Sequence, residues 1–258
     1  MRTLARTRRR EPESAVPRDV RGEIRRYYAA LLAQWGPQRW WPAQSRFEMI
    51  VGAFLTQNTS WTNVERAMRS LRRARQLSLA GIRGIPEPEL AQLIRSSGYY
   101  QQKTHRLKRF VAWLDATYGG SLTRMFAQPT EKLRAELLAL HGVGPETADS
   151  ILLYAGGHPV FVVDAYTRRI FERHHLTRKE MKYDDLRVLV ESALAEVGSD
   201  LARGSQPMHP HSRMSRAQRS ERVQHFNELH GLIVRTGKEF CGTQASCAGC
   251  PLEKFLPR

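Results

Sequence analysis

The strongest constraint on the fold is a succession of helical segments separated by glycine and proline breaks. Apolar residues recur at helical spacing from Ile24 to Leu32 and again from Phe47 to Leu55, which predicts one helix in each stretch. The same spacing predicts further helices over residues 62–74, 87–95, 101–118, 130–139, 146–156, 164–173 and 182–196. Only residues 159–163 resemble a strand, and they are short enough to be an extended link. We therefore expect an all-α fold.

The charge is strongly unbalanced towards positive residues. Lys and Arg number 41 against 25 Asp and Glu, so the formal net charge is +16. This excess favours a nucleic-acid partner, because each neutralised phosphate releases counterions. Charge alone leaves membrane surfaces, ribosomes and a purely solubilising role open. No apolar run approaches the ~20 residues that cross a bilayer, so we expect no membrane partner and a cytoplasmic, nucleoid-associated location.

Two Arg-rich stretches have too few apolar residues to predict packed structure. Residues 1–19 are expected to form a disordered basic tail. Residues 198–222 almost lack large apolar side chains and are expected to form an exposed, disordered insertion. A phosphate-contacting arm is the less favoured alternative for this second stretch.

The segment from Leu137 to Leu152 predicts two helices joined by a tight turn. Gly142 and Gly144 permit positive φ and leave backbone N–H groups uncovered. Pro145 stands at the start of the second helix, where its missing N–H costs nothing. A helix N-terminus preceded by open amides can bind a phosphate. An ordinary helical hairpin is the alternative for this segment alone.

Asp164 stands between the apolar residues 161–163 and the helix predicted over 164–173. The simplest interpretation is an N-cap, the commonest role for an Asp at the start of a helix. A partly buried acid beside a cleft is the alternative, and its position relative to the hairpin decides between them.

Together, the hairpin and the run from Val163 to Arg169 resemble the helix-hairpin-helix DNA glycosylases, specifically the endonuclease III branch, over about residues 20–250. The resemblance implies two helical lobes with a DNA cleft between them. One lobe would be a six-helix barrel at 48–158 that contains the motif at 137–155; the other would combine 20–47 with 159–258. It implies double-stranded DNA as the partner. We expect a monomer, because a basic cleft enzyme needs no partner subunit.

The resemblance assigns Asp164 to the catalytic aspartate of the family. Its carboxylate would stabilise the oxocarbenium-like sugar and orient or activate the attacking water. Bifunctional members carry a lysine where this chain has Glu146. Because a carboxylate cannot form an imine with the sugar, the enzyme is expected to be monofunctional and to leave an abasic site.

The resemblance also assigns positions that contact DNA. The hairpin would grip a phosphate, and its carbonyls would hold a monovalent cation. Gln57 would fill the gap left by the flipped base, and an apolar wedge would come from one of two tyrosines. Flipping is required because the glycosidic bond is inaccessible inside a duplex. The DNA-binding residues expected on this basis are Gln57, Tyr99, Tyr100, His141, Gly142, Val143 and Gly144.

The choice of base rests on aromatic residues. A Trp-Trp-Pro run and Trp61 resemble the endonuclease III-like 3-methyladenine DNA glycosylases, in which matching aromatics sandwich the flipped base. An indole stacks well on a cationic alkylpurine. The alternative is that these tryptophans are core anchors. The base-pocket residues expected are Trp40, Trp41, Pro42, Trp61, Lys238 and Glu146.

Three cysteines lie close together near the C-terminus. Cys241, Cys247 and Cys250 resemble the family's iron–sulfur loop, in which four thiolates hold a [4Fe–4S] cluster. The fourth cysteine is expected near Leu256, and the chain has no other. Three alternatives remain open: a three-cysteine cluster with a histidine or non-protein ligand, a zinc site with a nearby His, or no bound group.

Two function hypotheses follow. The first is a monofunctional glycosylase for alkylated purines, with an endonuclease III-type glycosylase and AP lyase for oxidised pyrimidines as its nearest variant. The second is a non-catalytic DNA-binding protein that retains the hairpin. Asp164 and the aromatic set distinguish them, because a simple binder needs no acid beside a pocket.

Overall fold

The computed structural model describes residues 19–40, 43–195, 197–198 and 212–257, and every regular element in these ranges is helical. The one β-bridge among them joins Cys241 and Ala245. The predicted all-α class is confirmed. None of the helices described is long and apolar enough to cross a membrane. The expected tail lies outside the described residues, apart from Asp19.

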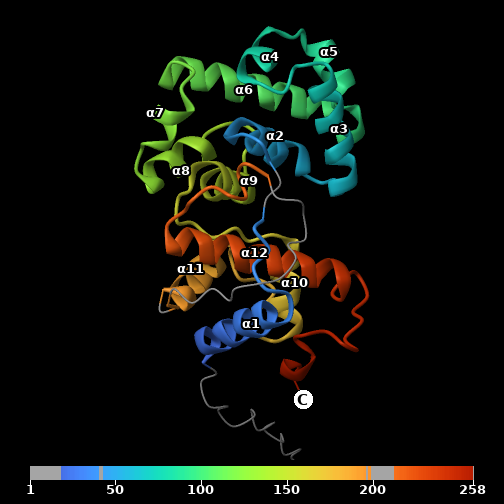
Figure 1. The fold of residues 1–258 in the computed structure, drawn as a ribbon, viewed down its shortest axis with the longest axis vertical. Helices are drawn as coiled ribbons and strands as arrows, with labels where there is room; N and C mark the ends of the chain where they lie inside the picture. Colours follow the sequence, from blue (N-terminus) through green and yellow to red (C-terminus); the bar gives the residue numbers. More distant parts are fainter. Residues whose placement is uncertain (1–18, 41–42, 196, 199–211, 258) are drawn as a thin grey trace, which may run out of the picture.

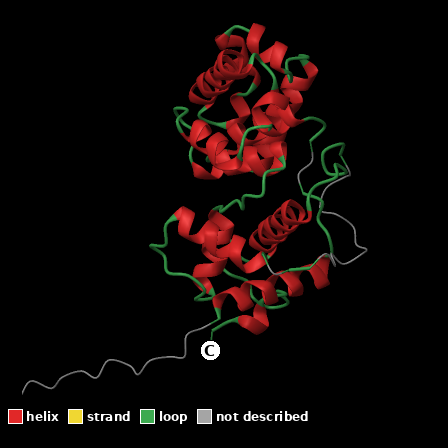
Figure 2. Cartoon of the chain, turned by 90° about the vertical axis from the view of Figure 1, so that its left-hand side faces the viewer, coloured by secondary structure: helices red, strands yellow, loops and turns green. Residues whose placement is uncertain are grey.

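The helices fall into two groups that lie one above the other in Figures 1 and 2. The upper group surrounds α2, which is buried along almost its whole length from Phe47 to Leu55. It consists of α2 (Arg46–Thr56), α3 (Trp61–Arg73), α4 (Leu79–Gly84), α5 (Glu87–Leu93), η1 (Arg95–Ser97), α6 (Tyr100–Tyr118), α7 (Leu122–Phe126), α8 (Thr130–Leu138), α9 (Pro145–Ser150) and the π-helical turn η2 (Ile151–Gly156).

The lower group brings the N-terminal helix together with the C-terminal part of the chain (Figure 1). Ile24, Tyr27, Tyr28 and Leu31 form the buried stripe of the first helix, as their spacing predicted. The last long helix contacts the other helices of this group and also η2 of the upper group. The members are α1 (Val20–Trp35), α10 (Ala165–Arg173), α11 (Tyr183–Leu194), α12 (Glu221–Glu239) and η3 (Glu253–Phe255).

The segment expected to be an extended link at 159–163 forms no strand. Its side chains from Val160 to Val163 are buried, so its backbone polar groups need partners. Phe161 N donates to Glu191 Oε1 at 2.9 Å, and Val163 N donates to the Tyr183 hydroxyl at 3.2 Å. Side chains of α11 therefore replace a neighbouring strand.

The longest unpredicted helix is α12. It carries buried polar residues among its apolar ones, including His225, Asn227, Glu228 and His230. A helix covered on all sides shows no apolar stripe, which is why its periodicity did not reveal it. The short helices α4 and α7 were also not predicted, because each is little longer than one turn.

Part of the stretch expected to be exposed and disordered, residues 212–222, lies within the described ranges, and most of its residues are exposed. Ser212 and Ser215 are buried and hydrogen-bond each other, and Met214 N donates to Ala43 O at 3.1 Å. The first residues of α12 complete this stretch. Hydroxyl groups that cap one another can pack where apolar side chains are few. Residues 199–211 lie outside the described ranges.

An ion pair beneath the hairpin connects the two groups. Arg134 in α8 donates from Nε and Nη2 to the carboxylate of Asp149 in α9, at 2.7 and 3.1 Å. Its Nη2 also donates to Asp184 Oδ1 in α11 at 2.7 Å. The Asp149 side chain is fully buried, so its charge depends on this bidentate partner.

We expect Arg134→Leu to lower the free energy of unfolding by about 3–5 kcal/mol, because it leaves the Asp149 carboxylate buried without its guanidinium. Urea denaturation of the DNA-free protein measures this. The double variant Arg134→Leu, Asp149→Leu removes both charges and is expected to be more stable than the single variant. A double variant no more stable than Arg134→Leu would contradict this view of the pair.

Candidate functional site

The turn between α8 and α9 has two glycines in different conformations. Gly142 has a φ of +85°, in the left-handed region that favours glycine. A Cβ at this position would lie 2.2 Å from Nε of Arg106, so side-chain packing also excludes a larger residue. Gly144 has a φ of −92°, so it does not use the positive φ that a glycine permits. A Cβ there would meet open space.

The turn between α8 and α9 has one buried residue that holds it in the core and exposed residues that a ligand can contact. Val143 is buried at 7% exposure, and its N–H donates to Leu140 O at 3.0 Å. His141 and Gly144 are exposed. Pro145 begins α9, as predicted. The turn therefore presents the backbone on either side of Val143 to a ligand, while the valine side chain holds the turn in the core.

Asp164 caps α10 and is also largely buried. One carboxylate oxygen accepts from the backbone N–H of Thr167 at 2.7 Å and from its hydroxyl at 2.9 Å. The other oxygen lies 3.5 Å from Nε2 of His230 on α12, and the Asp164 side chain is 12% exposed. The N-cap interpretation and the buried-acid interpretation are thus both correct.

These contacts keep Asp164 ionised. Burial alone would raise its pKa, but His230 and the two Thr167 hydrogen bonds outweigh burial and lower the pKa below the ordinary value. A carboxylate that remains charged inside a protein can stabilise a positive charge that develops beside it.

His230 belongs to a chain of polar groups that the sequence alone did not reveal. Its Nδ1 hydrogen-bonds the hydroxyl of Tyr154, which is buried in η2. Burial, followed by the charge of Asp164, raises the pKa of Tyr154, so its hydroxyl stays neutral. A neutral Tyr154 that donates to Nδ1 leaves the ring proton on Nε2, the nitrogen that faces Asp164.

Glu146 occupies the second position of α9, close enough to Asp164 for the two charges to interact. Glu146 keeps an exposed surface, but partial loss of hydration among the surrounding protein atoms, followed by the negative charge of Asp164, raises its pKa to about 7. His230 and Arg168 oppose this shift. The site thus contains two carboxyl groups whose pKa values move in opposite directions, an arrangement often found where the two groups have different roles.

Gln57 at the end of α2 contacts the hairpin directly. Its amide nitrogen donates to Gly142 O at 3.1 Å and to the Thr147 hydroxyl at 2.9 Å, and its amide oxygen accepts from Arg106. One of the hairpin carbonyls expected to hold a cation therefore has a protein donor. Arg106, which the sequence did not single out, links this glutamine to α6.

Trp40 is buried in the core at 4% exposure, as the core-anchor alternative predicted, and Lys238 lies over its ring. Lys238 Nζ lies 5.7 Å from the centre of the Trp40 ring. Partial burial lowers the pKa of Lys238, while the negative charges of Glu65 and Asp164 oppose this. Glu65 accepts from Nε1 of Trp61 at 2.8 Å. Residues of both helix groups therefore meet near Asp164. Trp41 and Pro42 lie outside the described residues.

The structure distinguishes the two candidate wedge residues. Tyr99 is 65% exposed and has a φ of +44°, a strained conformation for a residue with a side chain. Tyr100 is partly buried and packs against the core. The loop beneath them is fixed by buried Lys103, whose Nζ donates to Leu55 O at 2.9 Å and Ser97 O at 2.6 Å.

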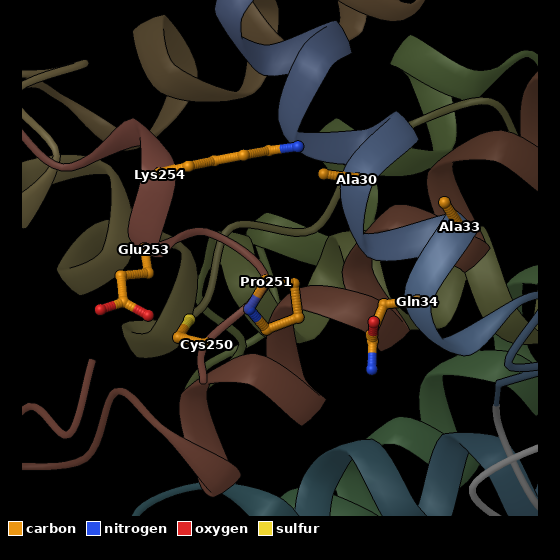
Figure 3. A pocket seen from close by; sticks show the side chains of 7 residues that line it. All are labelled: Ala30, Ala33, Gln34, Cys250, Pro251, Glu253 and Lys254. Atoms are coloured by element: carbon orange, nitrogen blue, oxygen red, sulfur yellow. The ribbon is translucent and has the colours of Figure 1, made fainter. Parts of the chain in front are cut away.

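The cysteine loop folds against α10 and α1. Arg173 donates from Nη1 to Cys241 Sγ at 3.1 Å, and Arg169 donates to the Cys241 carbonyl at 2.7 Å. Burial, followed by the neighbouring Cys247 and Cys241 thiols, raises the pKa of Cys250, which places all three thiols near one another. On the α1 side, Cys250 lines an open cavity of about 490 Å³ (Figure 3).

The three thiols are donors of the type that iron–sulfur clusters use. All three line one internal cavity of about 220 Å³. Within the described ranges, no three His, Cys, Asp or Glu side chains converge closely enough to hold one metal ion. A cluster spaces its thiolates around a larger core. The donor set thus supplies three of the four corners of such a cluster.

Comparison with known proteins agrees with this geometry. Residues 51–196 match the model of the HhH-GPD superfamily base excision DNA repair proteins. A protein of Methanocaldococcus jannaschii, named as a DNA repair glycosylase, is 41% identical over 236 residues, which cover 90% of this chain and 94% of that protein.

Two solved structures share the fold. The 3-methyladenine DNA glycosylase of H. pylori, bound to 1,N6-ethenoadenine, superposes with a TM-score of 0.68 at 28% identity, over 86% of this chain and 98% of that one. An endonuclease III–DNA covalent intermediate gives a TM-score of 0.67 at 20% identity, over 92% and 95% of the two chains. The chain therefore belongs to the HhH-GPD superfamily of base excision DNA repair proteins.

Proposed function

We propose that this protein is a monofunctional DNA glycosylase that hydrolyses the N-glycosidic bond of a flipped alkylated purine such as 3-methyladenine. The observation that carries the proposal is the pair of carboxyl groups at the site. Asp164 is held ionised by His230 and Thr167, and Glu146 stands where bifunctional relatives carry a lysine. This pair suits charge stabilisation and hydrolysis and offers no amine at that position.

In this proposal Asp164 acts on the sugar. As the bond to the base breaks, positive charge develops on the sugar, and an ionised carboxylate stabilises it most strongly where water is scarce. The same carboxylate orients the attacking water. His230 keeps Asp164 charged and fixed in orientation, since its Nε2 faces one oxygen while Thr167 holds the other.

The base pocket is proposed to favour a cation. The Lys238 ammonium lies over the Trp40 ring in the free protein, which indicates that this indole face accepts positive charge. An N-alkylated purine presents the same charge to the same ring, and its positive charge also makes it a good leaving group. Glu146 and Glu65 add negative charge nearby. The H. pylori relative is a 3-methyladenine glycosylase by name.

Double-stranded DNA is the proposed partner. The hairpin offers exposed backbone around Gly144. Gln57, which is hydrogen-bonded to the hairpin, is proposed to fill the gap that a flipped base leaves. Tyr99 is the proposed wedge, because it is exposed in a strained conformation ahead of α6. Pushing an aromatic side chain into the base stack offsets part of the cost of flipping.

The cysteine loop is proposed to hold a [4Fe–4S] cluster. When bound, such a cluster cross-links the loop and adds charge close to a DNA-facing surface, and it takes no part in breaking the glycosidic bond. Arg169 and Arg173 connect this loop to α10, whose first residue follows Asp164.

The proposal is tested on methylated duplex DNA, with the products scored before and after hot alkali. We expect release of 3-methyladenine and strand breaks that appear only after alkali. Breaks without alkali on oxidised-pyrimidine DNA, with no methylpurine released, would establish a lyase.

Borohydride trapping of Lys238→Arg beside wild type would then show whether Lys238, whose pKa is lowered, forms the imine. Binding without release of any base would establish a non-catalytic protein.

Asp164→Asn is expected to lower the rate of base release by about 10²–10³-fold or more, because the developing charge loses its carboxylate. DNA affinity should change little. Asn caps a helix about as well as Asp, so the fold of α10 is retained. Single-turnover kinetics and DNA titration separate the two quantities. Asp115→Asn, which alters an exposed acid paired with Arg83, is the matched control. Wild-type rates in Asp164→Asn would refute the assignment.

Activity is expected to rise with pH around 7. Glu146 has a pKa of about 7 in the free enzyme, and its ionised form adds negative charge beside the developing cation. We expect kcat/KM to increase by about tenfold as Glu146 ionises. Glu146→Gln should remove the inflection near pH 7. An inflection that persists unchanged in this variant would show that another group titrates.

Stability should respond to the same group with the opposite sign. The folded protein raises the pKa of Glu146 from 4.5 to about 7, so it binds this proton more tightly than the unfolded chain. The resulting stabilisation is present below pH 4.5 and is lost as the pH rises to about 7. Thermal unfolding of Glu146→Gln and wild type should therefore diverge as the pH rises from 4.5 to about 7, with the variant the more stable at and above pH 7.

A further inference from the structure

The internal cavity at the cysteine loop contains a fourth ligand-bearing side chain. Besides the three cysteines, His174 lines the same cavity of about 220 Å³. The remaining wall is mostly apolar and is formed by Ile170, Phe240, Ala245, Leu252 and Leu256, together with Thr236 and Arg173. An apolar wall keeps water away from a bound metal group.

The position where the family's fourth cysteine is expected is filled by a leucine. Leu256 lies in the cavity wall, so the loop does lead the chain to this place, but its side chain has no atom that can bind iron. The chain therefore reaches the position of the fourth ligand, but the residue there cannot bind a metal. A fourth ligand from the protein would therefore come from another part of the fold.

His174 has the surroundings of a metal-binding histidine. Its ring is buried at 6% exposure, and Nδ1 hydrogen-bonds the hydroxyl of Tyr27 on α1 at 2.9 Å. The two rings meet edge to face, with centres 5.2 Å apart. Histidine ligands usually donate their second ring N–H to a neighbouring acceptor, which fixes the tautomer. The tautomer that the proposal requires is the one in which Nδ1 donates to Tyr27 and the lone pair lies on Nε2.

The adjacent arginine supplies the charge that such a centre needs. Arg173 donates to Cys241 Sγ at 3.1 Å and to the carbonyls of Gly242 and Thr243 at 2.9 and 2.7 Å. Hydrogen bonds to the sulfur atoms and nearby positive charge stabilise thiolate-bound clusters. Arg173 and His174 are neighbours at the end of α10, so one helix end contributes both groups.

We propose that His174 is the fourth protein ligand, so that Cys241, Cys247, Cys250 and His174 together hold a [4Fe–4S] cluster. This extends the cofactor proposed above and is independent of the substrate preference. A zinc ion needs its donors to converge at about 2.0–2.3 Å, whereas no such convergence exists in the described part of the chain. The cavity instead has room for a polyatomic core.

The first experiment uses the full-length chain, purified without oxygen and reconstituted with iron and sulfide. We expect iron and acid-labile sulfide in equal amounts, as a [4Fe–4S] cluster requires. Mössbauer spectra of the resting protein should show one iron site distinct from the other three. Pulsed electron paramagnetic resonance of a one-electron reduced or oxidised sample should show nitrogen coupling from a histidine ligand.

Three variants assign that nitrogen. His174→Cys keeps a ligand at the position, so the cluster should remain while the nitrogen coupling and the distinct iron site disappear. His175→Asn changes the neighbouring exposed histidine, whose φ is +55° and suits Asn; its spectra should match wild type. Tyr27→Phe removes the hydroxyl that orients His174 and should speed iron loss to a chelator by about 10–100-fold.

Several results would overturn the proposal. They are bound zinc in place of iron, no bound metal after reconstitution, a wild-type cluster without nitrogen coupling, and coupling that survives in His174→Cys. None of these spectra depends on base release. A protein that binds the cluster but releases no base would contradict the glycosylase mechanism alone, and an active protein without a histidine-ligated cluster would contradict this inference alone.

Discussion

The buried ion pair between Arg134 and Asp149 is the interaction on which the site depends. It joins the two helices of the hairpin, and the contact with Asp184 attaches them to α11 in the other helix group. Asp149 and Glu146 lie in the same short helix, α9. The ion pair with Arg134 therefore fixes the position of Glu146 as well as that of Asp149. Bidentate geometry matters here, because two parallel hydrogen bonds define an orientation as well as a distance.

A second constraint is that the protein shifts the pKa values of two neighbouring carboxyl groups in opposite directions. Asp164 receives hydrogen bonds and faces His230, which lowers its pKa. Glu146 keeps an exposed surface, but it is partly desolvated and faces the charge of Asp164, which raises its pKa to about 7. One group is therefore a permanent anion and the other titrates near neutrality. Different surroundings, rather than different chemistry, give two carboxyl groups separate roles.

Helix α10 connects Asp164, the proposed catalytic residue, to the cysteine loop. Asp164 caps the first turn of this helix, and His174 follows its last residue. Arg169 and Arg173, both within the helix, donate hydrogen bonds to Cys241 of the cysteine loop. A helix of nine residues is stiff, so any group that fixes the loop also fixes the direction of the Asp164 carboxylate. This would give the cluster proposed at the cysteine loop a structural role at a distance from the proposed catalytic carboxylate.

The sequence by itself determined the helical class, most helix boundaries, the hairpin with Pro145 at its helix start, and Asp164 at the start of α10. All of these depend on local spacing and capping, which a single chain segment carries. Only the tertiary structure decided that His230 faces Asp164, that Glu65 lies beside Lys238, and that His174 shares a cavity with the cysteines. These contacts join residues far apart in the chain, and buried helices such as α12 show no apolar stripe that could have revealed them.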